Sequence, residues 1–95
     1  MKHCIIAKFG DMAADKKETL AQVKALFAAA APVDGVTGIV IHENCVARDN
    51  RYDLMIVVEM ARDALGAWDA SEIHHQWKAQ FGGMLASKAI FDYED

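Results

Sequence analysis

Two histidines are the residues of this chain whose type and placement favour chemistry. His74 interrupts an apolar stripe that recurs every three or four residues, the spacing of a helix face turned toward a core. His3 occupies the inward phase of an alternating segment typical of a strand. An imidazole has two ring nitrogens that need partners and changes protonation near neutral pH, which suits it to acid–base work. We therefore expect both side chains to face one small interior. The other stripe positions are Ile73, Trp77, Phe81, Met84 and Leu85.

The chain alternates between strand-like and helix-like patterns in an informative order. Strand patterns cover residues 2–9, 36–45, 52–60 and 88–93, a hairpin loop is expected at 47–51, and helical patterns cover 15–31 and the region from 65 to the Gly82–Gly83 pair. Asp15 with Glu18 predicts the start of the first helix, and Pro32 ends it. The second helical region is expected to break near Ser71, a good N-cap residue.

The order strand, helix, strand, strand, helix, strand is that of the ferredoxin-like split βαβ arrangement. We therefore expect an α+β fold, βαββαβ, with a four-stranded antiparallel sheet whose first and third strands are central. Right-handed crossovers place both helices on one face of that sheet. A chain of 95 residues has room for one domain, so residues 1–95 are expected to form a single unit.

Two helices on one face leave the other face of the sheet uncovered. The opposite-phase residues predict an apolar patch there, made of Cys4, Ile6, Met55, Val57 and Ile90. The hydrophobic content of 54% is also high for a chain this short. We therefore expect a homodimer, with sheet facing sheet around a two-fold axis.

Composition excludes several classes of partner. The net charge of −4 and the lack of a basic block argue against nucleic acid. No apolar run approaches the roughly 20 residues of a membrane span, and the N-terminus lacks the apolar core of a signal peptide. A cytoplasmic location is the expectation.

The two cysteines, Cys4 and Cys45, are expected to be small buried hydrophobes. Their strands should flank the third strand and so lie about 9.5 Å apart. A disulfide needs α-carbons within about 7 Å, so an internal bond is not expected. His42 lies near Cys45, but no second pair has zinc spacing, and no metal site is expected.

Four segments carry a resemblance to a known family. They are the opening strand at 2–9, the Tyr-Asp-Leu strand at 52–59, the helix segment at 68–74 and the closing Asp92–Tyr93 pair. Their order and spacing resemble the stress-responsive α/β-barrel domain family, small proteins of the dimeric α+β barrel class. The resemblance spans nearly the whole chain. In this chain Ser71-Glu72 stands where the family usually has His-Pro, and Trp68 stands where it has Tyr.

A plant branch of that family contains a polyketide cyclase that needs no cofactor and whose pocket lies between sheet and helices. His3 and His74 match two of its pocket histidines, whereas Leu54 and Trp68 replace a third histidine and a tyrosine. The resemblance implies that His74 and His3 are the candidate catalytic residues and that no cofactor is used. Ile5, Leu54, Trp68, Trp77 and Phe81 would line the ligand site, and the aromatic walls favour a flat, mostly apolar ligand.

Three functions stay open at this point. The first is a homodimer that binds a hydrophobic or aromatic small molecule without turning it over. The second is a cofactor-independent cyclase, isomerase or lyase, in which His74 removes an acidic proton next to a carbonyl and His3 or a water stabilises the enolate. The third is a structural or protective oligomer with a filled interior, in which His74 merely bonds a backbone carbonyl. A monooxygenase of the same barrel class is suggested by fold alone.

Overall fold

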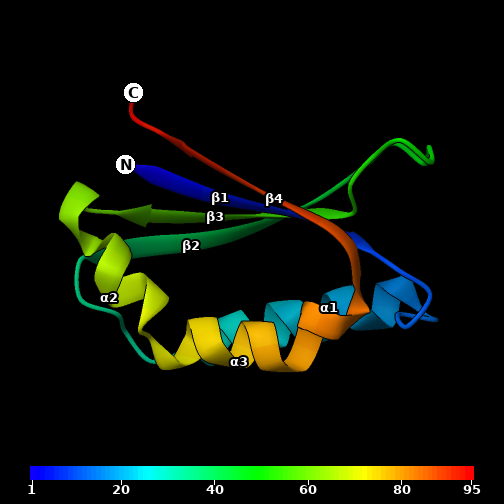
Figure 1. Cartoon of the computed structure of the whole chain (residues 1–95), viewed down its shortest axis with the longest axis horizontal. Helices are drawn as coiled ribbons and strands as arrows, with labels where there is room; N and C mark the ends of the chain where they lie inside the picture. The colour runs from blue at the N-terminus through cyan, green and yellow to red at the C-terminus, as the bar shows by residue number, and fades with distance from the viewer.

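Four antiparallel strands form one sheet, and the helices lie on one side of it (Figure 1). The computed structural model describes residues 1–95. The strands are β1 (Lys2–Phe9), β2 (Val36–Glu43), β3 (Leu54–Met60) and β4 (Leu85–Tyr93), and the helices are α1 (Lys16–Ala28), α2 (Leu65–Asp69) and α3 (Glu72–Phe81). Short 3-10 turns at Arg62–Ala64 and Gly82–Met84 precede α2 and β4. None of the helices has the length and apolar character needed to cross a membrane.

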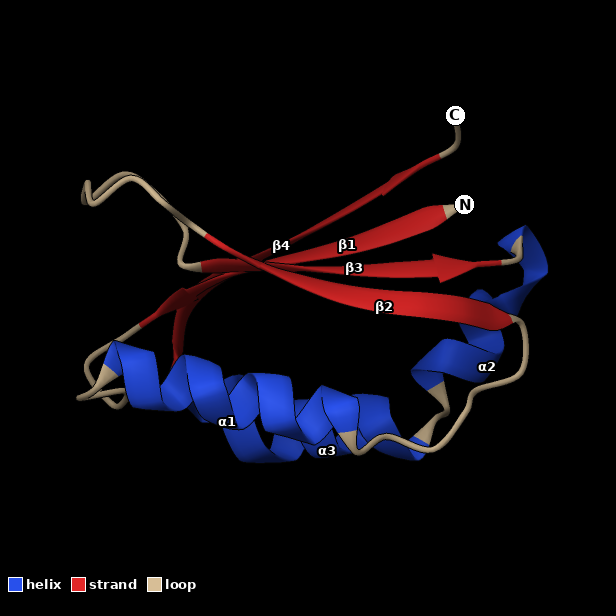
Figure 2. Cartoon of the chain, turned by 180° about the vertical axis from the view of Figure 1, so that it is seen from behind, coloured by secondary structure: helices blue, strands red, loops and turns tan.

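The strand order is β2-β3-β1-β4, so β1 and β3 are central as the sequence predicted. All three strand pairings are antiparallel. Viewed from behind, α1 and α3 run side by side beneath the sheet, and α2 covers the end where the N-terminus lies (Figure 2). The α+β fold and the one-sided placement of the helices are confirmed.

Side-chain caps and one proline set the helix ends. The Asp15 carboxylate accepts a hydrogen bond from the Glu18 amide at 3.1 Å, as the capping pattern predicted. The Ser71 hydroxyl does the same for the His74 amide at 3.2 Å, so the break between α2 and α3 also lies where it was expected. Helix α1 ends at Ala28 rather than at 30 or 31. Pro32 prevents the helix from continuing further, and its last turn tightens because the Ala30 amide donates to the Phe27 carbonyl at 3.2 Å.

Two strand boundaries differ from the sequence pattern. Strand β2 ends earlier than predicted, and strand β3 begins later. The connecting loop therefore covers residues 44–53 and not only 47–51. Strand β4 begins at Leu85 rather than at 88, because Leu85 pairs with Phe9 beyond a register shift in β1. Both differences lie at one end of the sheet, where backbone irregularity overrides the simple alternation.

Strand β3 and helix α3 supply much of the core. Alternate β3 residues from Leu54 to Met60 are at most 2% exposed. On α3 the predicted stripe holds for its first three apolar positions, which are buried: Ile73, Trp77 and Phe81. Met84 and Leu85 leave the helix, since α3 ends at Phe81 before the two adjacent glycines.

The face of the sheet that points away from the helices is apolar, but its membership differs from the prediction. Directly paired residues of antiparallel strands share a face. Ile90 pairs with the core residue Ile5, so Ile90 lies on the helix side and was assigned to the wrong face. Phe91 pairs with Cys4 and takes its place. We call this surface the open face: its apolar residues are Cys4, Ile6, Val40, Met55, Val57, Ala89, Phe91 and Tyr93.

The tight turn before β2 provides a test of the fold. Gly35 has φ of 81°, and a Cβ there would lie 2.5 Å from the Cβ of Ala64. Gly35→Ala is therefore expected to lower the free energy of unfolding by about 1–3 kcal/mol, measured by urea denaturation. Gly66→Ala is the control: it meets nothing within 4 Å and lies in α2, where alanine favours the helix. Equal stability of the two variants would contradict this account of the turn.

Candidate functional site

His3 is held at the start of β1 by a carboxylate from β4. The His3 side chain is buried, and its Nδ1 contacts Oδ1 of Asp92, the residue that pairs with it across the two strands. An ionised carboxylate only accepts hydrogen bonds, so Nδ1 donates, and in the neutral ring Nε2 is then the acceptor. Strand register thus fixes both the position and the tautomer of His3.

Trp68 links this histidine to the helix layer. The indole comes from α2 and is fully buried. Its ring centroid lies 6.3 Å from that of His3, in an edge-on arrangement, and 5.7 Å from that of His74. The indole Nε1 is also buried and has no hydrogen-bond partner. A buried donor without an acceptor costs about 1–3 kcal/mol, so this N–H is an exception that calls for an explanation.

His74 is oriented by the junction between α2 and α3. Its ring is partly exposed, and its Nδ1 lies 3.0 Å from the carbonyl oxygen of Asp69, the last residue of α2. A carbonyl cannot donate, so Nδ1 carries the hydrogen and Nε2 is the acceptor. His74 therefore makes the backbone bond expected of a structural histidine and also keeps one nitrogen available for a proton.

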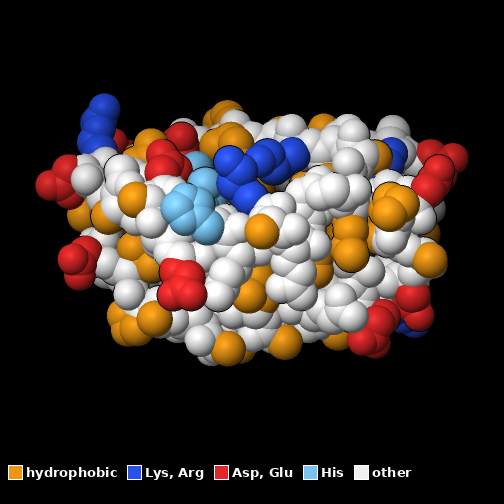
Figure 3. Space-filling view, turned by 60° about the horizontal axis from the view of Figure 1, so that its bottom comes forward, with side chains coloured by type: hydrophobic (Ala, Val, Ile, Leu, Met, Phe, Trp, Pro, Cys, Tyr) orange, Lys and Arg blue, Asp and Glu red, His pale blue; other side chains and the backbone are white.

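We call His3, Trp68, His74 and Asp92 the His–Trp cluster. The structure brings both predicted histidines to the same indole, although no residue of the cluster lines any of the five main surface pockets. On the helix side of the molecule, histidine side chains reach the surface beside acidic and basic groups (Figure 3). The catalytic roles of His3 and His74 stay predictions.

The five predicted lining residues belong to the packed core. Ile5, Leu54, Trp68, Trp77 and Phe81 are each at most 2% exposed. Trp77 packs against Phe81 in a tilted arrangement, with 5.6 Å between ring centroids. Phe27 of α1 contacts both tryptophans, at 6.5 Å from Trp68 and 5.9 Å from Trp77. The aromatic rings therefore form one continuous layer between the helices and the sheet.

The sequence analysis missed Asp92 as a member of the site. It was noted only as part of the closing strand of the family resemblance. The signal that identifies it is the cross-strand pair with His3, which becomes visible once the β1–β4 register is known. The position of Phe27 as the ring between the two tryptophans likewise follows only from the helix packing.

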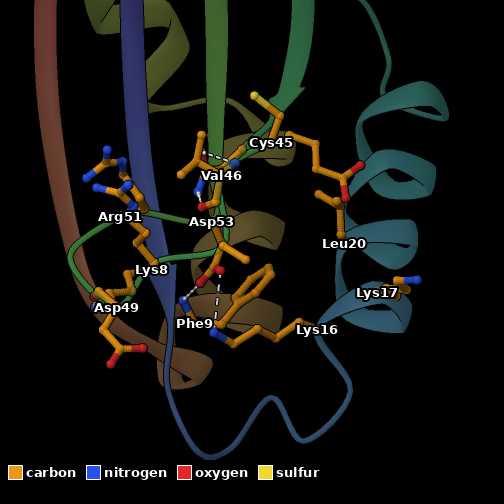
Figure 4. A pocket seen from close by; sticks show the side chains of 14 residues that line it. Lys8, Phe9, Lys16, Lys17, Leu20, Cys45, Val46, Asp49, Arg51 and Asp53 are labelled. Carbon is orange, nitrogen blue, oxygen red and sulfur yellow. Dashed lines mark hydrogen bonds and ion pairs between the residues drawn. The ribbon is translucent and has the colours of Figure 1, made fainter.

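A large surface pocket lies at the other end of β1. It has a volume of about 650 Å³ and is enclosed by the end of β1, the first turns of α1 and the 44–53 loop (Figure 4). Asp53 lies near its centre, where its carboxylate accepts from the Phe9 amide at 2.7 Å and from Lys16 at 3.5 Å. Sequence reasoning did not identify this pocket, because the irregular loop that forms one wall has no periodic pattern.

The two cysteines lie in different environments, and one expectation about them is wrong. Both are free thiols, with Cys4 buried and Cys45 exposed on the wall of the large pocket. Cys45 follows the end of β2 rather than continuing it, which is why it is not a core residue. Burial raises the pKa of the Cys4 thiol, and the nearby Asp92 carboxylate adds to this rise.

Comparison with known proteins identifies the fold. No family model and no curated protein matches the sequence. A dimeric ferredoxin-like protein of unknown function from Thermobifida fusca matches 99% of this chain and 89% of its own, with a TM-score of 0.77 and 18% identity. A similar dimeric protein from Jannaschia sp. matches 99% and 97% of the two chains, with a TM-score of 0.77 and 15% identity.

A third solved structure connects the fold to the resemblance seen in the sequence. A DABB family protein with a ferredoxin-like fold, from Mesorhizobium loti, matches 99% of this chain and 94% of its own, with a TM-score of 0.70 and 13% identity. Its description agrees with the resemblance to dimeric α+β barrel proteins. At these identities the likeness establishes the architecture, and the chain therefore has the ferredoxin-like fold of these proteins.

Proposed function

We propose that this chain is a single-domain, cytoplasmic member of the stress-responsive α/β-barrel family. In this proposal it forms a homodimer through the open face. It binds a small, mostly apolar or aromatic molecule that carries an acceptor oxygen, and the binding site is the His–Trp cluster. The observation that carries the ligand part is the buried, unpartnered indole N–H of Trp68 beside two histidines.

Exposure of large apolar side chains supports the dimer. On the open face, Phe91 is 61% exposed and Val40 is 53% exposed. Monomeric soluble proteins rarely leave a contiguous apolar patch of this kind uncovered. The similar proteins from Thermobifida fusca and Jannaschia sp. are described as dimeric. A second copy, packed sheet to sheet, covers the face with complementary apolar residues.

The hydrogen-bonding state of the cluster supports the type of ligand. An acceptor oxygen placed next to Trp68 would satisfy the indole N–H and recover the cost of leaving it unpaired. A carbonyl or phenol oxygen meets this need, and the aromatic layer around the indole suits a flat body. Helix α2 has only 5 residues, so its displacement during ligand entry breaks few backbone hydrogen bonds.

The open face provides the test of the dimer. Phe91→Lys is expected to yield a monomer at concentrations where the unmodified chain is dimeric, measured by light scattering. Burying a Phe side chain contributes about 1.5–3 kcal/mol, and a two-fold interface loses this contribution twice. The dissociation constant of the dimer should therefore rise by more than about a hundredfold. Ile90→Lys is the matched control, because this neighbouring exposed residue lies on the helix side. A monomeric unmodified chain at micromolar concentration refutes the dimer.

Paired ligands test the role of Trp68. Acetophenone and ethylbenzene have similar shapes, but only the ketone can accept a hydrogen bond. We expect Trp68→Phe to weaken acetophenone binding about five- to tenfold, measured by calorimetry, and to leave ethylbenzene nearly unchanged. Trp77→Phe makes a comparable loss of volume in the same aromatic layer and should affect both ligands alike.

Two outcomes would overturn this assignment. If neither ligand binds while the dimer persists, the third hypothesis, a structural or protective oligomer, is favoured. If Trp68→Phe weakens the binding of both ligands equally, packing rather than the indole N–H accounts for their affinity.

A second candidate function is proton transfer, and the tautomers of the two histidines favour it. Both rings donate from Nδ1 and keep Nε2 as an acceptor. His74 can then take the proton next to a ligand carbonyl, while the Trp68 N–H bonds the enolate oxygen. Asp92 is a positioning residue in this scheme, because its carboxylate bonds the His3 ring.

Exchange of the acetophenone methyl protons in D₂O, followed by NMR, tests this second function. The base removes a proton from the methyl carbon, and a deuteron from solvent returns to it. His74→Gln should slow catalysed exchange at least about a hundredfold. His75→Gln is the control, since the adjacent residue is exposed and points elsewhere on the helix. Unchanged exchange in His74→Gln, or no exchange above the buffer rate in the unmodified protein, rules out His74 as the base.

A further inference from the structure

The large pocket at the far end of β1 concentrates positive charge in a protein that is negative overall. The chain has 10 Lys and Arg residues and a net charge of −4. Half of these basic residues line this one pocket, against three acidic residues. The basic residues are Lys8, Lys16, Lys17, Arg48 and Arg51. The pocket is therefore an electropositive site at some distance from the His–Trp cluster.

Two of the acidic side chains in the pocket already have partners. Asp53 accepts from the Phe9 amide at 2.7 Å and from Lys16 at 3.5 Å. Glu43 lies 3.9 Å from Lys24, which is outside the pocket. In contrast, Lys17 and Arg51 make no ion pair, and the Arg51 guanidinium donates only to the neutral amide of Asn50. The positive charge of the pocket thus remains available to a ligand.

The basic groups come from three separate elements that are tied together. Lys8 lies at the end of β1 and bonds the carbonyl of Asp49, which fixes the 44–53 loop to the strand. In the close view, Lys8 and Arg51 lie on one side of Asp53, Lys16 reaches toward Asp53 from α1, and the Lys17 side chain points outward at the rim (Figure 4). Asn44 closes a turn within the loop through its contacts with Val46. Several basic residues from three elements around one pocket favour a multiply charged anion over a single carboxylate.

Apolar side chains complete the pocket wall. Val46, on the loop, is 39% exposed, and Phe9 and Leu20 form part of the opposite side. The volume of about 650 Å³ is within the range of small-molecule sites. We propose that this pocket binds a small organic phosphate, with the phosphate between the basic side chains and the apolar body against the loop wall.

Calorimetric titration with three probes tests the proposal. Phenyl phosphate carries both a charged phosphate group and an aromatic ring. Inorganic phosphate carries only the charge, and phenol carries only the aromatic ring. We expect saturable binding of phenyl phosphate, weaker binding of inorganic phosphate and no binding of phenol at this site. The double variant Lys16→Gln/Arg51→Gln should lower the affinity for phenyl phosphate by at least about tenfold.

The matched control is Lys78→Gln/Lys88→Gln, which removes the same charge from outside the pocket. It should leave binding nearly unchanged, and both double variants should retain the far-UV circular dichroism of the unmodified chain. Absence of saturable binding, or an equal loss in both double variants, overturns the proposal. Inorganic phosphate binding as tightly as phenyl phosphate overturns the organic part of the ligand assignment.

Discussion

The constraint on which the structure depends is the one-sided covering of a four-stranded sheet. Helices cover only one face, so each strand must present different chemistry on its two sides. On β1, adjacent residues therefore lie on opposite faces of the sheet: His3 points into the helix layer, and Cys4 points to the open face. The candidate ligand site and the candidate dimer interface are thus two sides of the same strand, one residue apart.

The break between α2 and α3 determines what the helix layer can do. Ser71 ends one helix and caps the next, which turns Trp68 and His74 toward each other although they lie on different helices. A continuous helix would leave the Asp69 carbonyl bonded within the backbone and unable to orient the His74 ring. Ser71 therefore has a clear structural role in this chain.

Periodicity predicted the elements of this fold well because their two faces differ so strongly. The alternation along β3 and the apolar stripe of α3 follow directly from burial, and the caps at Asp15 and Ser71 follow from local hydrogen bonding. Cross-strand register is not encoded in a single strand. For that reason the sequence placed Ile90 on the wrong face and overlooked the contact of Asp92 with His3. The basic pocket depends on an aperiodic loop, which no pattern of spacing describes.

Strand β4 is an edge strand with large apolar side chains on both of its faces. Ile90, on the helix side, is 48% exposed, and Phe91, on the open face, is 61% exposed. Its outer backbone groups are unpaired within the sheet, so a separated protomer offers a template for strand addition by any other chain. In the proposed dimer, a partner packed on the open face covers Phe91, so the apolar side chains next to this edge are less available to another chain. Because the concentration of separated protomers still rises with total concentration, a variant with a weakened dimer would aggregate more as its expression level increases.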